Sequence, residues 1–257
     1  PGDYLERTRL HPEQLTSVPV TVVSAAAGYG KSVLVSRWLE LWDGPGAWLS
    51  LDEKDNDLRR FLAHFLSAIK TVFPTAGLET LSMLKAPDLP KVPALAESLI
   101  IDLDRIEDRF ILVLDDFHRI HEQSVLDLLA EMLRYPTESM HLVLASRRDP
   151  FLPISSLRAR GLVTEIRAQA LRFTAEETAA FLEGAFADQV EEAIAVAWAE
   201  KTEGWVTGLR LAALSLRHQA DARASMLETA RSSGFVAEYL FEEVLAKLPP
   251  DVRQHLL

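Results

Sequence analysis

The chain has 257 residues, of which 48% are hydrophobic and 25% charged, so it can bury a core large enough for one large domain and a smaller one. Its net charge of -11 argues against direct binding of nucleic acid, because such binding depends on Lys and Arg that displace phosphate counterions. It has no Cys, no apolar run of the roughly 20 residues that cross a bilayer, and no signal-peptide pattern, which predicts a cytoplasmic protein without membrane contact.

The first predicted strand, residues 20–25, leads into the segment SAAAGYGKS at residues 24–32, and a helical pattern follows from Val33. Small residues let the backbone curl so that successive N–H groups point at a polyphosphate, and the helix N-terminus adds positive charge. Lys31 would reach the β- and γ-phosphates and Ser32 would hold Mg²⁺. Ala25 stands where the usual G-x-x-x-x-G-K-[ST] pattern has Gly, while Gly28 and Gly30 preserve the tight part of the loop. The alternative is an ordinary small-residue turn with a solvated Lys.

A second strand is predicted at residues 47–51, and the run Asp55-Asn56-Asp57 then begins a helix. Apolar residues recur along that helix at three- and four-residue spacing, and a second helix shows the same spacing before the next strand. The positions are Leu58, Phe61, Leu62, Phe65, Leu66 and Ile69 in the first helix, and Leu95, Leu99, Leu103 and Ile106 in the second.

A strand is predicted at residues 110–115, where five apolar residues, 110–114, lead into two carboxylates, Asp115 and Asp116. Such a run is typical of a strand buried on both faces, and the carboxyl end of a parallel strand lies at the ligand crevice of an α/β sheet. Asp115 would therefore bind the Mg²⁺ shell, and Asp116 would orient or activate an attacking water. The alternative is an ordinary polar turn after a buried strand.

Two more strands are predicted at residues 141–145 and 162–166, and strands that alternate with helices indicate a parallel sheet covered on both faces. From Thr174, which begins a capping box with Glu177, the pattern is helical only. We therefore predict an α/β nucleotide-binding domain at residues 1–168 and an all-α domain at residues 169–247. Residues 248–257 would begin a further, truncated domain.

Two other groups of residues allow a functional and an ordinary interpretation. His118 and His121 flank the end of the acidic strand, but without a third His or a Cys a polar loop is favoured over a metal site. Arg148, Arg158 and Arg160 could act as an arginine finger on a neighbouring protomer, or could be solvated surface residues.

Seven segments in one order resemble the MalT-like signal-transducing (STAND) ATPases over nearly the whole chain. They are residues 25–34, 48–52, 112–118, 145–150, 157–161, 171–174 and 202–205. The resemblance implies a P-loop NTPase with a five-stranded parallel sheet, in which an extra strand separates the Walker A and Walker B motifs. An all-α domain would follow, and residues 248–257 would begin a winged helix.

The resemblance also implies roles for individual residues, all of them around a bound ATP or ADP. Asp115, Asp116 and Arg147 would be catalytic, with Arg147 detecting the γ-phosphate, and Ser32 and Asp115 would hold Mg²⁺, partly through water. Nucleotide contacts would come from Gly28, Tyr29, Gly30, Lys31, Ser32, Val33, Arg9 (near the adenine), Gly204 and Trp205.

The implied function is a switch: ADP holds the closed form, ATP with an inducer favours a self-associating form that activates transcription, and slow hydrolysis resets it. The partners would be a sensor and a LuxR-type DNA-binding domain elsewhere in the same protein, with ATP-dependent homo-oligomerisation and no DNA contact by this chain. The alternatives are a high-turnover ATPase or phosphotransferase and a nucleotide-binding scaffold that does not hydrolyse. Intact Lys31, Ser32, Asp115 and Asp116 argue against the scaffold.

Overall fold

A computed structural model describes residues 5, 7–11, 17–186 and 189–217. The contacts between residues divide the chain into two units. The sheet unit comprises the described residues of Leu10–Ala25 and Lys31–Arg167, and the helical unit comprises those of Pro1–Arg9, Ala26–Gly30 and Ala168–Leu257. The segment predicted to begin a winged helix, residues 248–257, lies outside the described residues.

The sheet unit is built on five parallel strands in the order β2-β3-β4-β1-β5. The strands are β1 (Val20–Ser24), β2 (Gly46–Ser50), β3 (Phe110–Asp115), β4 (Met140–Ser146) and β5 (Val163–Arg167). All five predicted strands are confirmed to within one residue at each end. The extra strand is confirmed as well, because β4 lies between β1 and β3.

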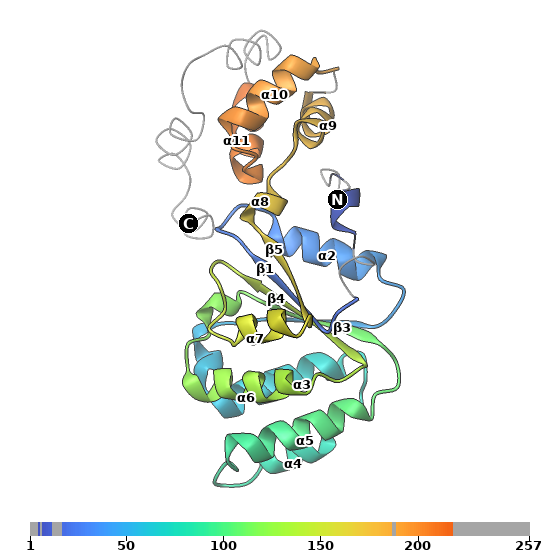
Figure 1. Ribbon diagram of the computed structural model, residues 1–257, viewed down its shortest axis with the longest axis vertical. Helices are drawn as coiled ribbons and strands as arrows, with labels where there is room; N and C mark the ends of the chain where they lie inside the picture. The colour runs from blue at the N-terminus through green and yellow to red at the C-terminus, as the bar shows by residue number, and fades with distance from the viewer. Residues whose placement is uncertain (1–4, 6, 12–16, 187–188, 218–257) are drawn as a thin grey trace. The chain divides into compact units, whose positions relative to one another are not determined.

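Helices cover both faces of this sheet, as predicted. Figure 1 shows α2 on one face and α3 and α6 on the other, with α4 and α5 forming a further layer beyond α3 and α6. The helices of the sheet unit are α2 (Lys31–Leu41), α3 (Leu58–Lys70), α4 (Leu78–Leu84), α5 (Val92–Asp104), α6 (Gln123–Arg134) and α7 (Ile154–Ala159), with 3-10 turns η2 (Glu53–Asn56) and η3 (Phe117–Arg119). The predicted start of α3 is confirmed, because the Asp57 side chain accepts a hydrogen bond from Arg60 N and caps the helix.

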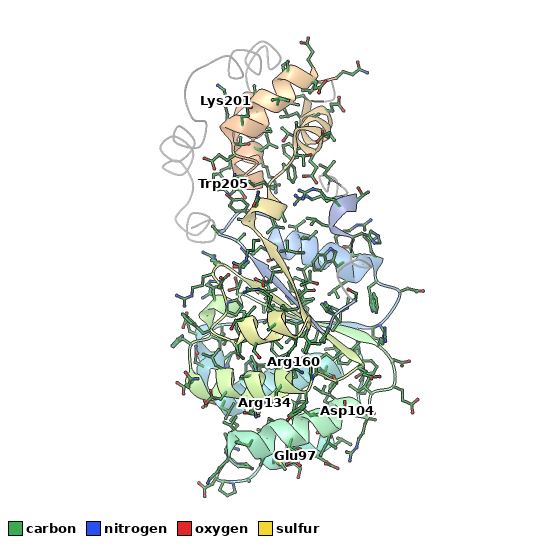
Figure 2. All side chains as sticks on the ribbon, viewed as in Figure 1. Glu97, Asp104, Arg134, Arg160, Lys201 and Trp205 are labelled. Carbon is green, nitrogen blue, oxygen red and sulfur yellow. The ribbon has the colours of Figure 1, made fainter. Side chains whose placement is uncertain are left out.

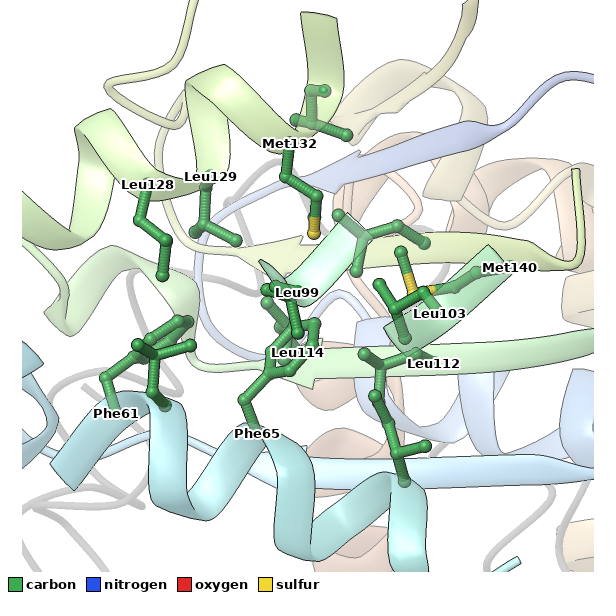
Figure 3. Packing of buried hydrophobic residues seen from close by; sticks show 14 of the residues in the cluster. Phe61, Phe65, Leu99, Leu103, Leu112, Leu114, Leu128, Leu129, Met132 and Met140 are labelled. Carbon is green, nitrogen blue, oxygen red and sulfur yellow. The ribbon is translucent and has the colours of Figure 1, made fainter. Parts of the chain in front are cut away.

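The core of the sheet unit lies between the sheet and these layers. Phe61 and Phe65 of α3 pack with Leu99 of α5 and with Leu112 and Leu114 of β3, and all are nearly inaccessible to solvent (Figure 3). The outward sides of α5 and α6 carry exposed charged residues, Glu97, Asp104 and Arg134 among them (Figure 2). Burial of one apolar stripe per helix therefore fixes the layer order.

The helical unit contains α8 (Ala168–Leu171), α9 (Ala175–Phe186), α10 (Glu192–Lys201) and α11 (Val206–Arg217), together with part of the 3-10 turn η1 (Thr8–Leu10). The capping box is confirmed: Thr174 N donates to Glu177 Oε2, and Glu177 N donates to Thr174 Oγ1. Trp198, Leu182 and Leu209 form its small core. Among the described residues, no helix is both long and apolar enough to cross a membrane.

Candidate functional site

The candidate site of the sheet unit lies where the parallel strands end. Ser24 at the end of β1 is in register with Ser146 at the end of β4, and Leu114 of β3 is in register with Leu144 of β4. Asp115, which follows Leu114, therefore lies at the same carboxyl edge of the sheet as Ser24. This edge is where open α/β sheets place their ligands.

Lys31 begins α2 directly after the loop, and only 9% of its surface is exposed. Its Nζ donates a 2.7 Å hydrogen bond to the carbonyl of Ala25. Burial lowers the pKa of the Lys31 ammonium, and the charge of Arg147 lowers it further. The carboxylates of Asp115 and Asp116 oppose both effects. Arg147, Asp115 and Asp116 are therefore all close enough to Lys31 to act on its charge, and their roles toward a nucleotide stay a prediction.

The two acids differ in environment. Asp115 is the last residue of β3 and is 8% exposed, whereas Asp116 is half-buried and is the N-cap of the turn η3. The backbone of Asp116 is left-handed, with φ 55° and ψ 33°, and its N–H donates to Asp115 Oδ1 at 2.9 Å. Left-handed backbone is uncommon for residues with a Cβ, although Asp tolerates it better than most. The turn therefore gives each carboxylate a separate, fixed place.

His118 belongs to the same group of charges, which the sequence did not indicate. Its Nδ1 is buried and lies 3.7 Å from Asp116 Oδ1. Burial lowers the pKa of the imidazole, Asp116 raises it, and the cations Arg147, Arg119 and Lys31 lower it further. A neutral ring is thus favoured beside Asp116.

The arginines considered as fingers have different surroundings. Arg148 donates from Nη2 to the carbonyl of His118 at 3.1 Å. Arg158 pairs with Glu165 through a 2.6 Å contact from Nε to Oε1, and its side chain is 57% exposed. Arg160, which follows α7, is also exposed. Their action on a neighbouring protomer stays a prediction.

The loop residues Ala26–Gly30 belong to the helical unit, in which Trp205 and Thr207 bind two of their carbonyl groups. Trp205, immediately before α11 (Figure 2), donates from Nε1 to Ala27 O at 3.2 Å. Thr207 donates to Gly28 O twice, from its backbone N–H at 3.1 Å and from Oγ1 at 3.0 Å. Because a trans peptide points its C=O and the next N–H in opposite directions, the N–H groups of Gly28 and Tyr29 face away from Trp205 and Thr207.

The two glycines of the loop serve different purposes. Both have left-handed backbone, with φ 79° at Gly28 and 78° at Gly30. A Cβ on Gly28 would lie 2.5 Å from Trp205 Nε1 and 2.7 Å from Thr207 Oγ1, whereas a Cβ on Gly30 would meet no atom within 4 Å. Gly28 is therefore needed for the close approach of the loop to α11, and Gly30 leaves open space beside the loop.

Two predicted nucleotide contacts have other partners here. A Cβ on Gly204 would lie 2.7 Å from Phe173 O, so this glycine permits close approach to the 172–173 backbone. Arg9 donates to the Glu177 carboxylate and to the carbonyls of Ala170 and Arg172, and Arg7 binds the same groups. Burial raises the pKa of Glu177, but the hydrogen bonds from Arg9 and Arg7 outweigh it and hold that pKa below its ordinary value.

The donor set fits a magnesium nucleotide. Oxygen ligands suit Mg²⁺, and the chain offers the exposed Ser32 hydroxyl in the first turn of α2 and the Asp115 carboxylate. In the sheet unit, the cation Lys31 suits phosphate. In the helical unit, the outward-turned N–H groups of the loop suit phosphate as well. Val33, 56% exposed, and Tyr29, half-buried, leave that first turn accessible.

The chain is similar to parts of much longer proteins. It is 34% identical over 239 residues to the serine/threonine-protein kinase PknK of Mycobacterium tuberculosis, covering 92% of this chain and 22% of that protein. It is 30% identical over 240 residues to the HTH-type transcriptional regulator MalT of Yersinia pestis, covering 93% of this chain and 26% of that protein. The chain thus spans about a quarter of the length of these relatives. No family model matches it.

Two solved structures share the fold. One is a Signal Transduction ATPase with Numerous Domains (STAND) protein with a tetratricopeptide repeat sensor from Pyrococcus horikoshii, with a TM-score of 0.65 and 18% identity over 96% of this chain and 33% of that one. The other is a Walker-type ATPase of Pyrococcus abyssi, with a TM-score of 0.56 and 16% identity over 98% of this chain and 76% of that one.

Proposed function

We propose that this chain, which belongs to the MalT-like STAND P-loop ATPases, is the ATP- and ADP-binding switch module of a bacterial transcriptional activator. The observation that carries the proposal is the group of Lys31, Asp115, Asp116 and Arg147 at the carboxyl edge of a parallel sheet. Lys31 follows directly in the chain a loop whose Gly28 and Gly30 have left-handed backbone.

In this function each residue has a distinct role toward Mg²⁺ and nucleotide. Ser32 and Asp115 would hold a Mg²⁺ ion, partly through water, and the ion would supply charge neutralisation at the phosphates. Lys31 and the N–H groups of the loop bind the β- and γ-phosphates. Asp116 orients the attacking water, and Arg147 contacts the γ-phosphate.

The switch requires the two nucleotides to differ in affinity for two conformations, since a ligand that binds both equally shifts nothing. The loop offers a route by which bound phosphate acts on the helical unit, because Trp205 and Thr207 bind the carbonyls of Ala27 and Gly28. A change in the loop peptides therefore changes the hydrogen bonds of α11. Slow hydrolysis then resets an ATP-bound, self-associating form.

The sensor and the output belong to parts of the protein outside this module. One relative is named an HTH-type transcriptional regulator, which favours a DNA-binding output in another part of the same protein. The relative named as a serine/threonine-protein kinase shows that a similar module also stands in a protein of another kind. The acidic charge of this chain favours DNA contact through another domain.

The test is to purify the chain under mild conditions, identify bound nucleotide by mass spectrometry, and measure turnover of added MgATP. We expect bound ADP or ATP and turnover well below about 1 s⁻¹, the lower end of ordinary enzyme rates. Faster turnover would indicate a true metabolic ATPase, and binding without any turnover would indicate a scaffold.

Variants of the acids test their separate roles. Asp116→Asn should keep nucleotide affinity and abolish hydrolysis, whereas Asp115→Asn should also weaken the dependence of binding on Mg²⁺. Asp127→Asn is the matched control, since this acid is exposed on α6 and binds Gln123 of the same helix. Kinetics equal to those of the parent for both Asp115 and Asp116 variants would contradict these roles.

A further inference from the structure

The side chain of Asn56 joins the turn after β2 to the segment after β3. Its Nδ2 donates to Glu53 O and to Arg119 O, each at 3.0 Å. Its Oδ1 accepts from the backbone N–H groups of His121 and Glu122, at 2.8 Å and 2.9 Å. The amide thus uses both donors and both acceptor sites, and three of the four bonds reach residues more than sixty positions away.

Asparagine suits this place better than its nearest analogues. Asp would keep the acceptors but would turn a carboxylate oxygen toward the carbonyls of Glu53 and Arg119, and Gln would be one methylene too long. The Oδ1 also accepts from the backbone N–H of Glu122, the N-cap of α6, and Glu122 makes no side-chain capping bond of its own.

Asn56 is itself held firmly by its neighbours. Asp55 is 1% exposed and binds Arg60 and His64, and its carboxylate also accepts from Asp52 N in a capping box. Asp57 caps α3 from the other side. The amide therefore projects from a rigid turn between β2 and α3.

The segment that Asn56 holds begins at the candidate water-orienting acid. Asp116 has left-handed backbone and is the N-cap of η3, and Asp116 O accepts from Arg119 N at 3.0 Å. Arg148 holds the middle of the segment through His118 O. A disfavoured backbone conformation persists only where the surroundings fix it, and Asn56 fixes the far end of this turn.

We propose that Asn56 is a positioning residue for Asp116: it holds the 116–122 segment so that the Asp116 carboxylate stays in one place. The proposal rests on the proposed function, because hydrolysis is the step that depends on that carboxylate. Asn56 acts through the backbone of Arg119, His121 and Glu122. Asn56 therefore affects the rate of hydrolysis, whereas nucleotide affinity depends on Lys31 and the loop.

The test compares Asn56→Asp with Gln123→Glu in the full chain. Both change an amide to an acid, but Gln123 is exposed and its side chain donates to Asp127 of its own helix. Amide hydrogen exchange across residues 116–122 should rise about five- to tenfold in Asn56→Asp, as expected for the loss of buried hydrogen bonds. Single-turnover hydrolysis of bound ATP should fall at least about tenfold while ADP affinity stays within about twofold.

Gln123→Glu should leave exchange, hydrolysis and affinity as in the parent. Asn56→Ala, which removes all four bonds without adding charge, takes the place of Asn56→Asp if that variant does not fold. Unchanged exchange at residues 116–122, or unchanged hydrolysis in a parent that turns over, would overturn the inference, as would an equal fall in ADP affinity. A parent that binds nucleotide without hydrolysis would contradict that part of the proposed function, and exchange would still decide whether Asn56 holds the turn.

Discussion

Replacing Gly28 with Ala should weaken the attachment of the loop to α11. The left-handed backbone costs a residue with a Cβ about 1–2 kcal/mol, and this cost applies equally at Gly30, whose φ is nearly the same. At Gly28 the new Cβ would also lie 2.5 Å from Trp205 Nε1 and 2.7 Å from Thr207 Oγ1. Overpacking of that kind costs about 1–3 kcal/mol more.

Neither Trp205 nor Thr207 can move away from the new Cβ without losing hydrogen bonds. Trp205 and Thr207 are both held by the loop carbonyls next to the new methyl group, so a shift breaks hydrogen bonds that contribute about 0.5–1.5 kcal/mol each. Gly28→Ala should therefore cost about 2–5 kcal/mol in total and Gly30→Ala about 1–2 kcal/mol.

Amide hydrogen exchange in α11 is the suitable assay, since it reports local opening in a chain with two units. Without added nucleotide, Gly28→Ala should lower the free energy of opening of α11 by about 1–3 kcal/mol more than Gly30→Ala, or about five- to 150-fold in exchange rate. Gly161→Ala is a second control, with φ 68° and no atom within 4 Å of its Cβ. Equal exchange in α11 for Gly28→Ala and Gly30→Ala would refute the reasoning.

Two further predictions concern pH and the Thr207 hydroxyl. Burial lowers the pKa of His141 to about 4, although its hydrogen bond to Val18 O opposes this effect. As pH falls from about 6.5 to about 4, the imidazole is therefore protonated in the unfolded chain before it is protonated in the folded chain, and the folded state loses stability. In urea unfolding, the free energy of unfolding of the parent should fall by up to about 3 kcal/mol across that pH window, and His141→Asn should lack this fall. The same dependence of unfolding free energy on pH in both proteins would contradict the prediction. Thr207→Val removes the hydroxyl bond to Gly28 O and should raise hydrogen exchange of the residue 207 amide, which donates to the same carbonyl, about three- to tenfold. Thr207→Ser should leave that exchange unchanged, and equal effects of the two variants would argue against the hydroxyl bond.

The sequence predicted the parts of the fold that local pattern determines. Apolar runs located all five strands, and Asp115 at the end of one such run lies at the predicted sheet edge. The capping residues Asp57 and Thr174 marked helix starts because their bonds reach only three residues along the chain. Patterns of this length need no knowledge of the tertiary structure.

The contacts that hold the candidate site depend on long-range packing, and the sequence did not indicate them. Thr207 binds a carbonyl 179 positions away, and Asn56 binds groups 63 to 66 positions away. A short polar side chain in a helix or turn has many possible partners, so its residue type alone does not select one. His118 was set aside as a loop residue, yet its ring is half-buried and its buried Nδ1 lies beside Asp116.

Calorimetric binding of MgADP and MgATP to the full chain and to Lys31→Ala tests the central claim most directly. The parent should bind both nucleotides, and loss of the Lys31 ammonium should weaken binding about ten- to a hundredfold, because charge-assisted hydrogen bonds contribute about 1.5–3 kcal/mol. Lys85→Ala, at an exposed position, should bind as the parent does. Unchanged affinity in Lys31→Ala would contradict the assignment of residues 24–32 as a phosphate-binding loop.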